Sequence, residues 1–265
     1  MDMNKQFGVR EIANVVLKAK ADMKIGNTDF AANEPVLYFD TLKTSTVEGA
    51  ATTVYATGGR GNARLISWDG ERTITFTMED ALISPMGLAI LTGAGLITST
   101  TEVLHFTERL VAKEGGAVSL SKTPSTDHPI YYAVVDADGT VPDQLTKATN
   151  AEAVKGAKEG DTVFVDYYAV QAGSLLIDIE PGKFSGNFYL EAATLFRDTD
   201  GKDHAAEFII PNCRVQSNFT FSMASSGDPS TFTFTMDAFP GYTAYDKTKK
   251  VLCAIQVLGE TASNS

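Results

Sequence analysis

The sequence predicts a mainly β fold: an antiparallel β-sandwich or barrel with one short packed helix and an inserted small β region. Several stretches alternate apolar and polar residues with a period of two, which is typical of strands with one buried and one wet face. Two of these stretches, TITFTMED (73–80) and TFTFTMDA (231–238), nearly repeat each other. Only one segment, LISPMGLAILTGAGL (82–96), combines clear helix start and stop signals.

Residues 1–30 are expected to form an N-terminal arm ahead of the first strand, PVLYFD (35–40). Ile12, Val15, Val16 and Ala19 follow helical spacing, which predicts a helix over about residues 8–24, although the same segment could be extended. Terminal segments of this kind are ordered only when something holds them, and a neighbouring subunit could do so.

The stretch 63–80 predicts a hairpin, because Asp69-Gly70-Glu71 separates ARLISW from RTITFTM. The glycine-rich TGGRGNAR (57–64) leads into a strand, so it predicts a tight glycine turn and not a phosphate-binding loop. In the helical segment, Ser84 is the expected N-cap, Pro85 takes the first helical position, and Gly93 or Gly95 ends the helix.

The second half of the chain predicts an insertion followed by further strands. Residues 113–172 carry shorter strands, around 130–135 and 161–168, and form the inserted β region; residues 31–112 and 173–265 form the sandwich. The strands 213–223 and 230–238 form a hairpin around Ser225–Pro229. The two near-identical strands are then the second limbs of hairpins in the two halves of the sandwich. Further strands are expected in SLLIDIEP, GNFYLEAATLF and VLCAIQVL.

Composition excludes several classes of protein. The formal net charge is −11, so tight binding to a phosphate backbone is not expected. No apolar run reaches the ~20 residues that cross a bilayer, and the N-terminus has no hydrophobic signal core. With only two cysteines, Cys213 and Cys253, the chain is not a disulfide scaffold; both are expected to be free thiols, although a bridge between neighbouring strands stays open.

No catalytic or metal-binding motif is found, and no cofactor is expected. His105, His128 and His204 do not share ligand or charge-relay spacing, and His105 is best explained as a strand residue. The acidic turns at 136–139 and 197–204 lack a complete calcium-ligand pattern and fit hairpin tips better. Asp178 and Glu180 share one strand face and could form the carboxylate pair of a glycosidase, but solvated strand charges explain them more simply.

Two long stretches resemble phage virion proteins. ATGGRGNARLISWDGERTITFTMEDALISPMGLAILTGAGL (56–96) is similar to the core of tail tube proteins from contractile-tailed phages. GNFYLEAATLFRD (186–198) and AEFIIPNCRVQSNFTFSMASSGDPSTFTFTMDAF (206–239) also resemble phage virion structural proteins. Inserted region 113–172 departs from the compact tube subunit and fits an outward-facing decoration.

The resemblance implies a structural virion protein, not an enzyme, that self-assembles into stacked, hexameric rings forming a tail tube for DNA passage. It also implies a location in the virion tail, synthesis in the bacterial host cytoplasm, and contacts with itself and with sheath, baseplate and terminator proteins. DNA would pass without specific binding, and no membrane is involved. The alternatives are another virion component, such as a head decoration or connector, and a carbohydrate-binding or hydrolytic β-sandwich module.

A tube for DNA needs a neutral to negative inner wall, because a basic wall would bind the phosphate backbone and slow its movement. Arg64, Arg72 and Arg214 are expected to point to subunit contacts or to the outside. The predicted lumen or assembly residues are the polar faces of the two repeated strands: Thr73, Thr75, Thr77, Glu79, Thr231, Thr233, Thr235 and Asp237.

Overall fold

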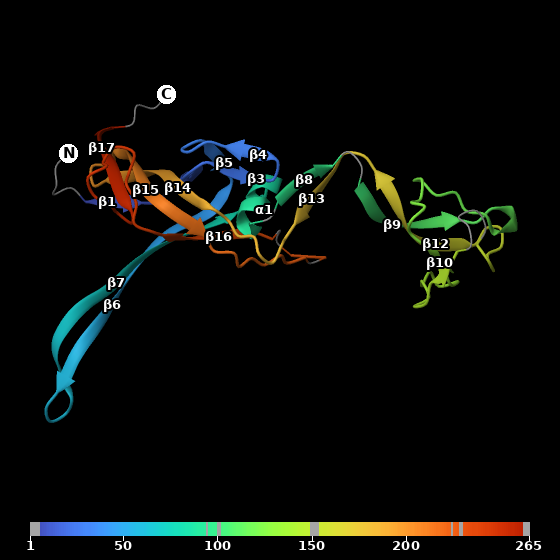
Figure 1. The fold of residues 1–265 in the computed structure, drawn as a ribbon, viewed down its shortest axis with the longest axis horizontal. Coiled ribbons are helices and arrows are strands. Elements are labelled where there is room, and N and C mark those ends of the chain that lie inside the picture. The colour runs from blue at the N-terminus through green and yellow to red at the C-terminus, as the bar shows by residue number, and fades with distance from the viewer. Residues whose placement is uncertain are drawn as a thin grey trace. The chain divides into compact units, whose positions relative to one another are not determined.

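The computed structural model describes residues 6–93, 95–99, 102–148, 154–223, 225–227 and 230–261, and it divides the chain into two compact units (Figure 1). Unit 1 comprises Met1–Ile97 and Ile177–Ser265, and unit 2 comprises Thr98–Leu176. The unit boundary therefore lies before strand β9 (Glu102–Val111), whereas we expected the insertion to begin at residue 113.

Unit 1 is built on one large antiparallel sheet, in the order β5-β2-β14-β15-β16-β7-β6. Short strand β1 adds to β14, and β17 adds to β15 beside β16. Strands β5 and β6 lie at the two ends of this order, so the sheet is open and forms no closed barrel. The bounds are β1 Phe7–Val9, β2 Asn14–Ala19, β5 Pro35–Phe39, β6 Leu42–Gly58, β7 Ala63–Asp80, β14 Asn187–Asp198, β15 Asp203–Val215, β16 Phe232–Ala238 and β17 Ala254–Thr261.

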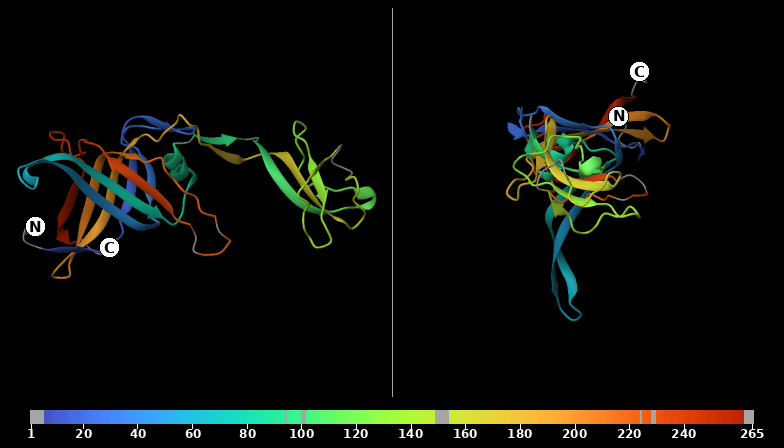
Figure 2. Two further views of the ribbon diagram at one scale, coloured as in Figure 1. Left: turned by 90° about the horizontal axis from the view of Figure 1, so that it is seen from below. Right: turned by 90° about the vertical axis from the view of Figure 1, so that its right-hand side faces the viewer.

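The sheet curls around its own core, so that strands distant in the sheet order face each other across it (Figure 2). The ring centroids of Phe39 on β5 and Phe234 on β16 lie 5.0 Å apart in an edge-to-face contact. Leu17, Phe188 and Phe234 are fully buried in this core. Each such side chain stabilises the fold by about 1.5–3 kcal/mol through apolar burial.

Helix α1 (Pro85–Thr92) packs against this core and confirms the predicted capping signals. The Ser84 Oγ accepts a hydrogen bond from the Gly87 amide at 3.0 Å, Pro85 begins the helix, and Gly93 ends it with φ of 70°. A Cβ at Gly93 would lie 2.6 Å from the Phe184 backbone, so glycine is needed there for space as well as for conformation. Ala89, Ile90 and Leu91 are buried.

The two repeated strands are direct antiparallel neighbours in one sheet, and the prediction that they belong to separate halves of the sandwich is wrong. Phe76 of β7 lies opposite Met236 of β16, and Met78 lies opposite Phe234. Both strands present alternate residues to the same core, and the pairing of like residues explains the near-repeat. Sequence separation gave no indication of this adjacency.

Strand β7 runs without a break through Asp69-Gly70-Glu71, so the predicted hairpin turn there is wrong. The register between β6 and β7 shifts at this point, which marks a β-bulge opposite Thr52. The Thr52 Oγ1 accepts a hydrogen bond from the Glu71 amide at 2.9 Å, and a Cβ at Gly70 would lie 2.3 Å from the same oxygen. The hairpin turn is instead the glycine-rich segment 59–62, which confirms the predicted glycine turn. The φ angles are 78° at Gly59 and 53° at Asn62.

The N-terminal segment is extended, and the prediction of a helix over residues 8–24 is wrong. Val15, Leu17 and Ala19 alternate inward along β2 and are fully buried, while Lys18 points outward and pairs with Glu191 of β14. Strand β2 lies between β5 and β14, so this part of the expected arm is an integral strand of the sheet. Next to it, β3 (Met23–Ile25) and β4 (Thr28–Phe30) form a small hairpin.

Strand β15 ends at Val215, eight residues earlier than the predicted strand 213–223. Cys213, Arg214 and Val215 pair with Ala238, Asp237 and Met236, so the antiparallel pairing of these segments is confirmed but their connection is longer than expected. In this connection, the Phe221 ring makes edge-to-face contacts with the ring of Phe219 and with that of Phe232, the first residue of β16. The predicted turn 225–229 lies partly outside the described residues.

Unit 2 contains a four-stranded antiparallel sheet in the order β11-β10-β12-β9. Its core includes Tyr132, Val163 and Tyr167, and the Tyr167 hydroxyl donates a hydrogen bond to Glu108 at 2.6 Å. Predicted strands around 130–135 and 161–168 are confirmed as β10 and β12. The bounds are β10 Tyr131–Val134, β11 Thr146–Lys147 and β12 Thr162–Gln171, and a 3-10 turn spans Glu114–Gly116.

Strands β8 (Gly95–Ser99) and β13 (Ser174–Asp178) pair with each other in a separate two-stranded sheet.

Candidate assembly surfaces

The face of β6, β7 and β16 that points away from the core is lined by threonines and acids. We call this the polar face. Cross-strand partners place its side chains in rows: Thr44, Glu79 and Thr233 form one row, and Thr46, Thr77 and Thr235 form the next. The third row is Glu48, Thr75 and Asp237, followed by Thr73 beside Ala50.

The structure thus brings together most of the predicted lumen or assembly residues. Thr73, Thr75, Thr77 and Glu79 share one face of β7, and Thr233, Thr235 and Asp237 lie beside them on β16. Thr231 immediately precedes β16, which begins at Phe232. Sequence analysis missed the β6 contribution, although the alternation of Thr44, Thr46 and Glu48 in KTSTVEG would have indicated it.

The polar face is acidic in its centre, and Arg214 of β15 lies beside it. Its acids are Glu48, Glu79 and Asp237; the Thr44 hydroxyl donates to Glu79 at 3.4 Å, and the Gln216 amide donates to Asp237 at 3.0 Å. Arg214 lies opposite Asp237, and directly opposed residues share a face. Arg214 therefore lies on the same face as Asp237, and its guanidinium lies 5.8 Å from the Phe184 ring.

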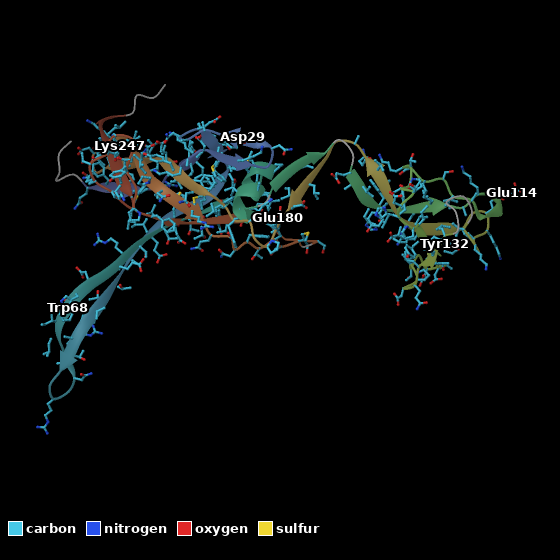
Figure 3. The ribbon with its side chains drawn as sticks, in the orientation of Figure 1. Asp29, Trp68, Glu114, Tyr132, Glu180 and Lys247 are labelled. Atoms are coloured by element: carbon cyan, nitrogen blue, oxygen red, sulfur yellow. The ribbon has the colours of Figure 1, made fainter. Side chains whose placement is uncertain are left out.

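The distal part of the β6–β7 hairpin exposes both of its faces to solvent, and one of them is apolar (Figure 3). Val54 lies opposite Trp68, and Ala56 lies opposite Ile66, so these four residues share one face. Val54, Ile66 and Trp68 are 62%, 56% and 53% exposed. The other face carries Thr53, Tyr55, Ser67 and Asp69, with Arg64 lying 4.1 Å over the Tyr55 ring.

The remaining candidate residues do not converge on a site in unit 1. Glu180 is exposed and forms an ion pair with Lys183, and Asp178 ends β13. His204 is buried, and its Nε2 donates a hydrogen bond to Asp198 Oδ2 at 3.0 Å. This contact explains the acidic turn 197–204 as a structural hairpin tip. His105 lies in β9 as predicted, but in unit 2.

Within the described residues, no group of three or more His, Cys, Asp or Glu side chains could hold a metal ion. The same residues contain no helix with the length and apolar character needed to span a membrane.

A curled antiparallel sheet with an acidic polar face and an uncovered apolar hairpin is the architecture of a structural protein with surfaces suited to assembly. The model of the YomU/Tube protein family matches residues 7–252, so the chain belongs to this family. It is a phage tube-like structural protein, and the resemblance to phage tail tube proteins is confirmed. No curated protein matches the chain significantly.

Proposed function

We propose that the protein self-assembles into stacked, hexameric rings that form a phage tail tube for DNA passage. The observation that carries this proposal is the apolar face of the β6–β7 hairpin. Its large side chains project beyond the core of unit 1, where only water covers them in the isolated chain. Leaving Val54, Ile66 and Trp68 in water is unfavourable, and contact with a second copy would bury them.

The form of the contact also favours a ring or a filament. We infer that the projecting apolar face of the hairpin packs against a different surface of a second copy. Contacts between unlike surfaces are heterologous, and they generate closed rings or open helical arrays instead of simple dimers. The proposed number of six subunits in each ring rests only on the resemblance to tail tube proteins, which form hexameric rings.

The polar face suits the lumen of such a tube. Threonine hydroxyls are neutral and well hydrated, and Glu48, Glu79 and Asp237 repel the phosphate backbone. Arg214 lies at the β15 side of this face, where Asp237 is its direct neighbour. A wall of this composition lets DNA move because it releases few counterions and forms few lasting contacts. We infer that the tube also contacts sheath, baseplate and terminator proteins in the virion tail.

The hairpin provides a matched test of assembly. Trp68→Glu places a charge on the apolar face, and Ser67→Glu places the same charge on the opposite face of the same strand. We expect the unsubstituted protein and Ser67→Glu to form rings or tubes in negative-stain electron microscopy and fast-sedimenting species in the ultracentrifuge. Trp68→Glu should stay monomeric with unchanged circular dichroism. Equal assembly of both variants would show that the apolar face makes no subunit contact.

Charge on the polar face tests DNA passage separately. Thr233 is exposed on this face, so Thr233→Lys should leave the fold and the tubes intact. Tubes with lysines in the lumen should retain DNA and slow its ejection from reconstituted virions, and Thr233→Ser should behave like the unsubstituted protein. Unchanged ejection with Thr233→Lys would mean that this face does not line the DNA path.

A further inference from the structure

One face of the unit 2 sheet is open. On β12, Val163, Val165 and Tyr167 point into the unit 2 core, and the alternate residues Asp166 and Tyr168 point to the other side. That other side is not covered by the rest of unit 2: Tyr168 is 37% exposed, and Val103 and Val170 beside it are also exposed. Nothing in the tube function proposed above uses this face.

Three aromatic rings form a row on the open face. Tyr168 lies opposite His105 in the ladder of β12 and β9, with ring centroids 5.3 Å apart. The His128 ring also contacts Tyr168, with the two ring centroids 4.7 Å apart. The sequence could not indicate this row, because its members lie far apart along the chain and come from two strands and a loop.

The loop that carries His128 is fixed to the sheet, so the row is preorganised. The Ser125 amide donates a hydrogen bond to the Tyr168 carbonyl at 2.7 Å, and Pro124 bridges to Ala169. Ser125 Oγ lies 3.1 Å from His128 Nδ1, which orients the imidazole. A site built on ordered backbone loses little conformational entropy when it binds a ligand.

Polar groups lie along the edge of the row. His105 Nε2 is 2.9 Å from Asp166 Oδ1, and about half of the His105 side chain remains exposed. Tyr131, on β10, lies opposite Asp166 on the same face. The surface therefore offers ring faces for C–H groups together with carboxylate, imidazole and hydroxyl groups for hydrogen bonds. A pyranose ring presents this combination of C–H faces and equatorial hydroxyls.

The net charge of unit 2 indicates which kind of flat-faced ligand fits the open face. Unit 2 contains six Lys and Arg residues and eleven Asp and Glu residues. Stacking platforms for single-stranded nucleic acid combine aromatic rings with a positively charged groove, whereas unit 2 has an excess of acids and Asp166 lies on its open face. An uncharged ligand avoids repulsion by Asp166.

We propose that the row His105–Tyr168–His128 is a binding site for a neutral polysaccharide, whose sugar rings stack on Tyr168 and His128 and whose hydroxyls bond to Asp166. Envelope glycans of a bacterial host and storage or matrix polysaccharides share this chemistry. A tube subunit with such a site in each copy would present a dense array, so weak single sites would bind a polymer with high avidity.

The test uses the full-length protein. Binding to insoluble chitin, cellulose and purified peptidoglycan is measured by co-sedimentation, and binding of chitohexaose and cellohexaose by calorimetry. Tyr168→Ala and His128→Ala should each weaken binding about tenfold or more, because each removes one stacking ring. Tyr168→Phe keeps the ring and should bind within a few-fold of the unsubstituted protein. Tyr245→Ala, which removes an exposed tyrosine of unit 1, is the matched control.

Preference for chitohexaose over cellohexaose would assign the site to polymers of N-acetylglucosamine, a sugar of the bacterial envelope, and the reverse preference to glucose polymers. Absence of binding to all five probes would overturn the proposal, as would equal binding by the Tyr168→Ala and Tyr245→Ala proteins. Loss of self-association in Tyr168→Ala without any glycan binding would also overturn it, since the face would then be a protein interface. Tube formation is scored on the same samples, so failure of the tube proposal remains distinguishable.

Discussion

At the scale of single residues, the Cys213 side chain is fully buried in the core of unit 1. Burial raises the pKa of its thiol to about 12, and burial also raises the pKa of the half-buried Cys253. The thiolate is the reactive form, and at pH 8 a thiol with a pKa near 12 is almost wholly protonated. We therefore predict that iodoacetamide leaves Cys213 unmodified in the native protein and modifies it after denaturation. The intact mass should match two free thiols, and a mass lower by two protons would contradict this.

Phe234 and Thr233 are adjacent but occupy opposite faces of β16, and this makes them a matched pair. Phe234 is fully buried against Phe39, whereas Thr233 is exposed. Phe234→Ala should lower the free energy of unfolding by about 3–5 kcal/mol, and Thr233→Ala should change it by less than about 0.5 kcal/mol. Urea unfolding followed by circular dichroism measures both. Similar losses for the two variants would show that the alternation along β16 does not define the core.

At the scale of elements, strand β2 determines what an N-terminal deletion does. Removal of residues 1–30 exposes the partners of Val15, Leu17 and Ala19 and separates β5 from β14. We predict that this deletion gives an insoluble or unfolded protein, although sequence analysis indicated only an arm that a neighbouring subunit could hold. Deletion of residues 1–5 alone retains every strand of the described residues and serves as the control. A soluble, cooperatively folded product from the longer deletion would contradict the assigned position of β2.

The elements also show what local sequence can and cannot predict. Capping of α1 by Ser84, Pro85 and Gly93 depends on neighbouring residues only, and it was predicted correctly. Asp69-Gly70-Glu71 resembles a hairpin turn, yet it forms a bulge because Thr52, a cross-strand residue, bonds to the Glu71 amide. The polar faces of β7 and β16 were each predicted. Their adjacency was not, because it depends on pairing between two strands whose repeated residues, such as Phe76 and Phe234, are 158 positions apart in the sequence.

At the scale of the whole molecule, the two strands that begin and end the sheet of unit 2 in the sequence have their outer ends side by side. Glu102 and Gln171 are cross-strand partners at the ends of β9 and β12. We predict that residues 102–171 can be replaced by a short Gly-Ser turn, which would join β8 and β13 as a hairpin, without loss of unit 1 folding or of assembly. Sedimentation and electron microscopy measure the outcome, and the variant should lose polysaccharide binding. Aggregation of the shortened chain would show that unit 1 depends on unit 2.

We propose that the β6, β7 and β16 strands of many copies form the wall of a tube through which DNA passes. Electron cryomicroscopy of the assembled protein, with helical reconstruction to side-chain detail, tests this arrangement. We expect a hollow tube in which Thr75, Thr77 and Thr235 face the lumen, with Trp68 buried against a second copy. A tube with these threonines on its outer surface and a lumen lined by Lys and Arg would contradict it, as would a protein that stays monomeric at every concentration.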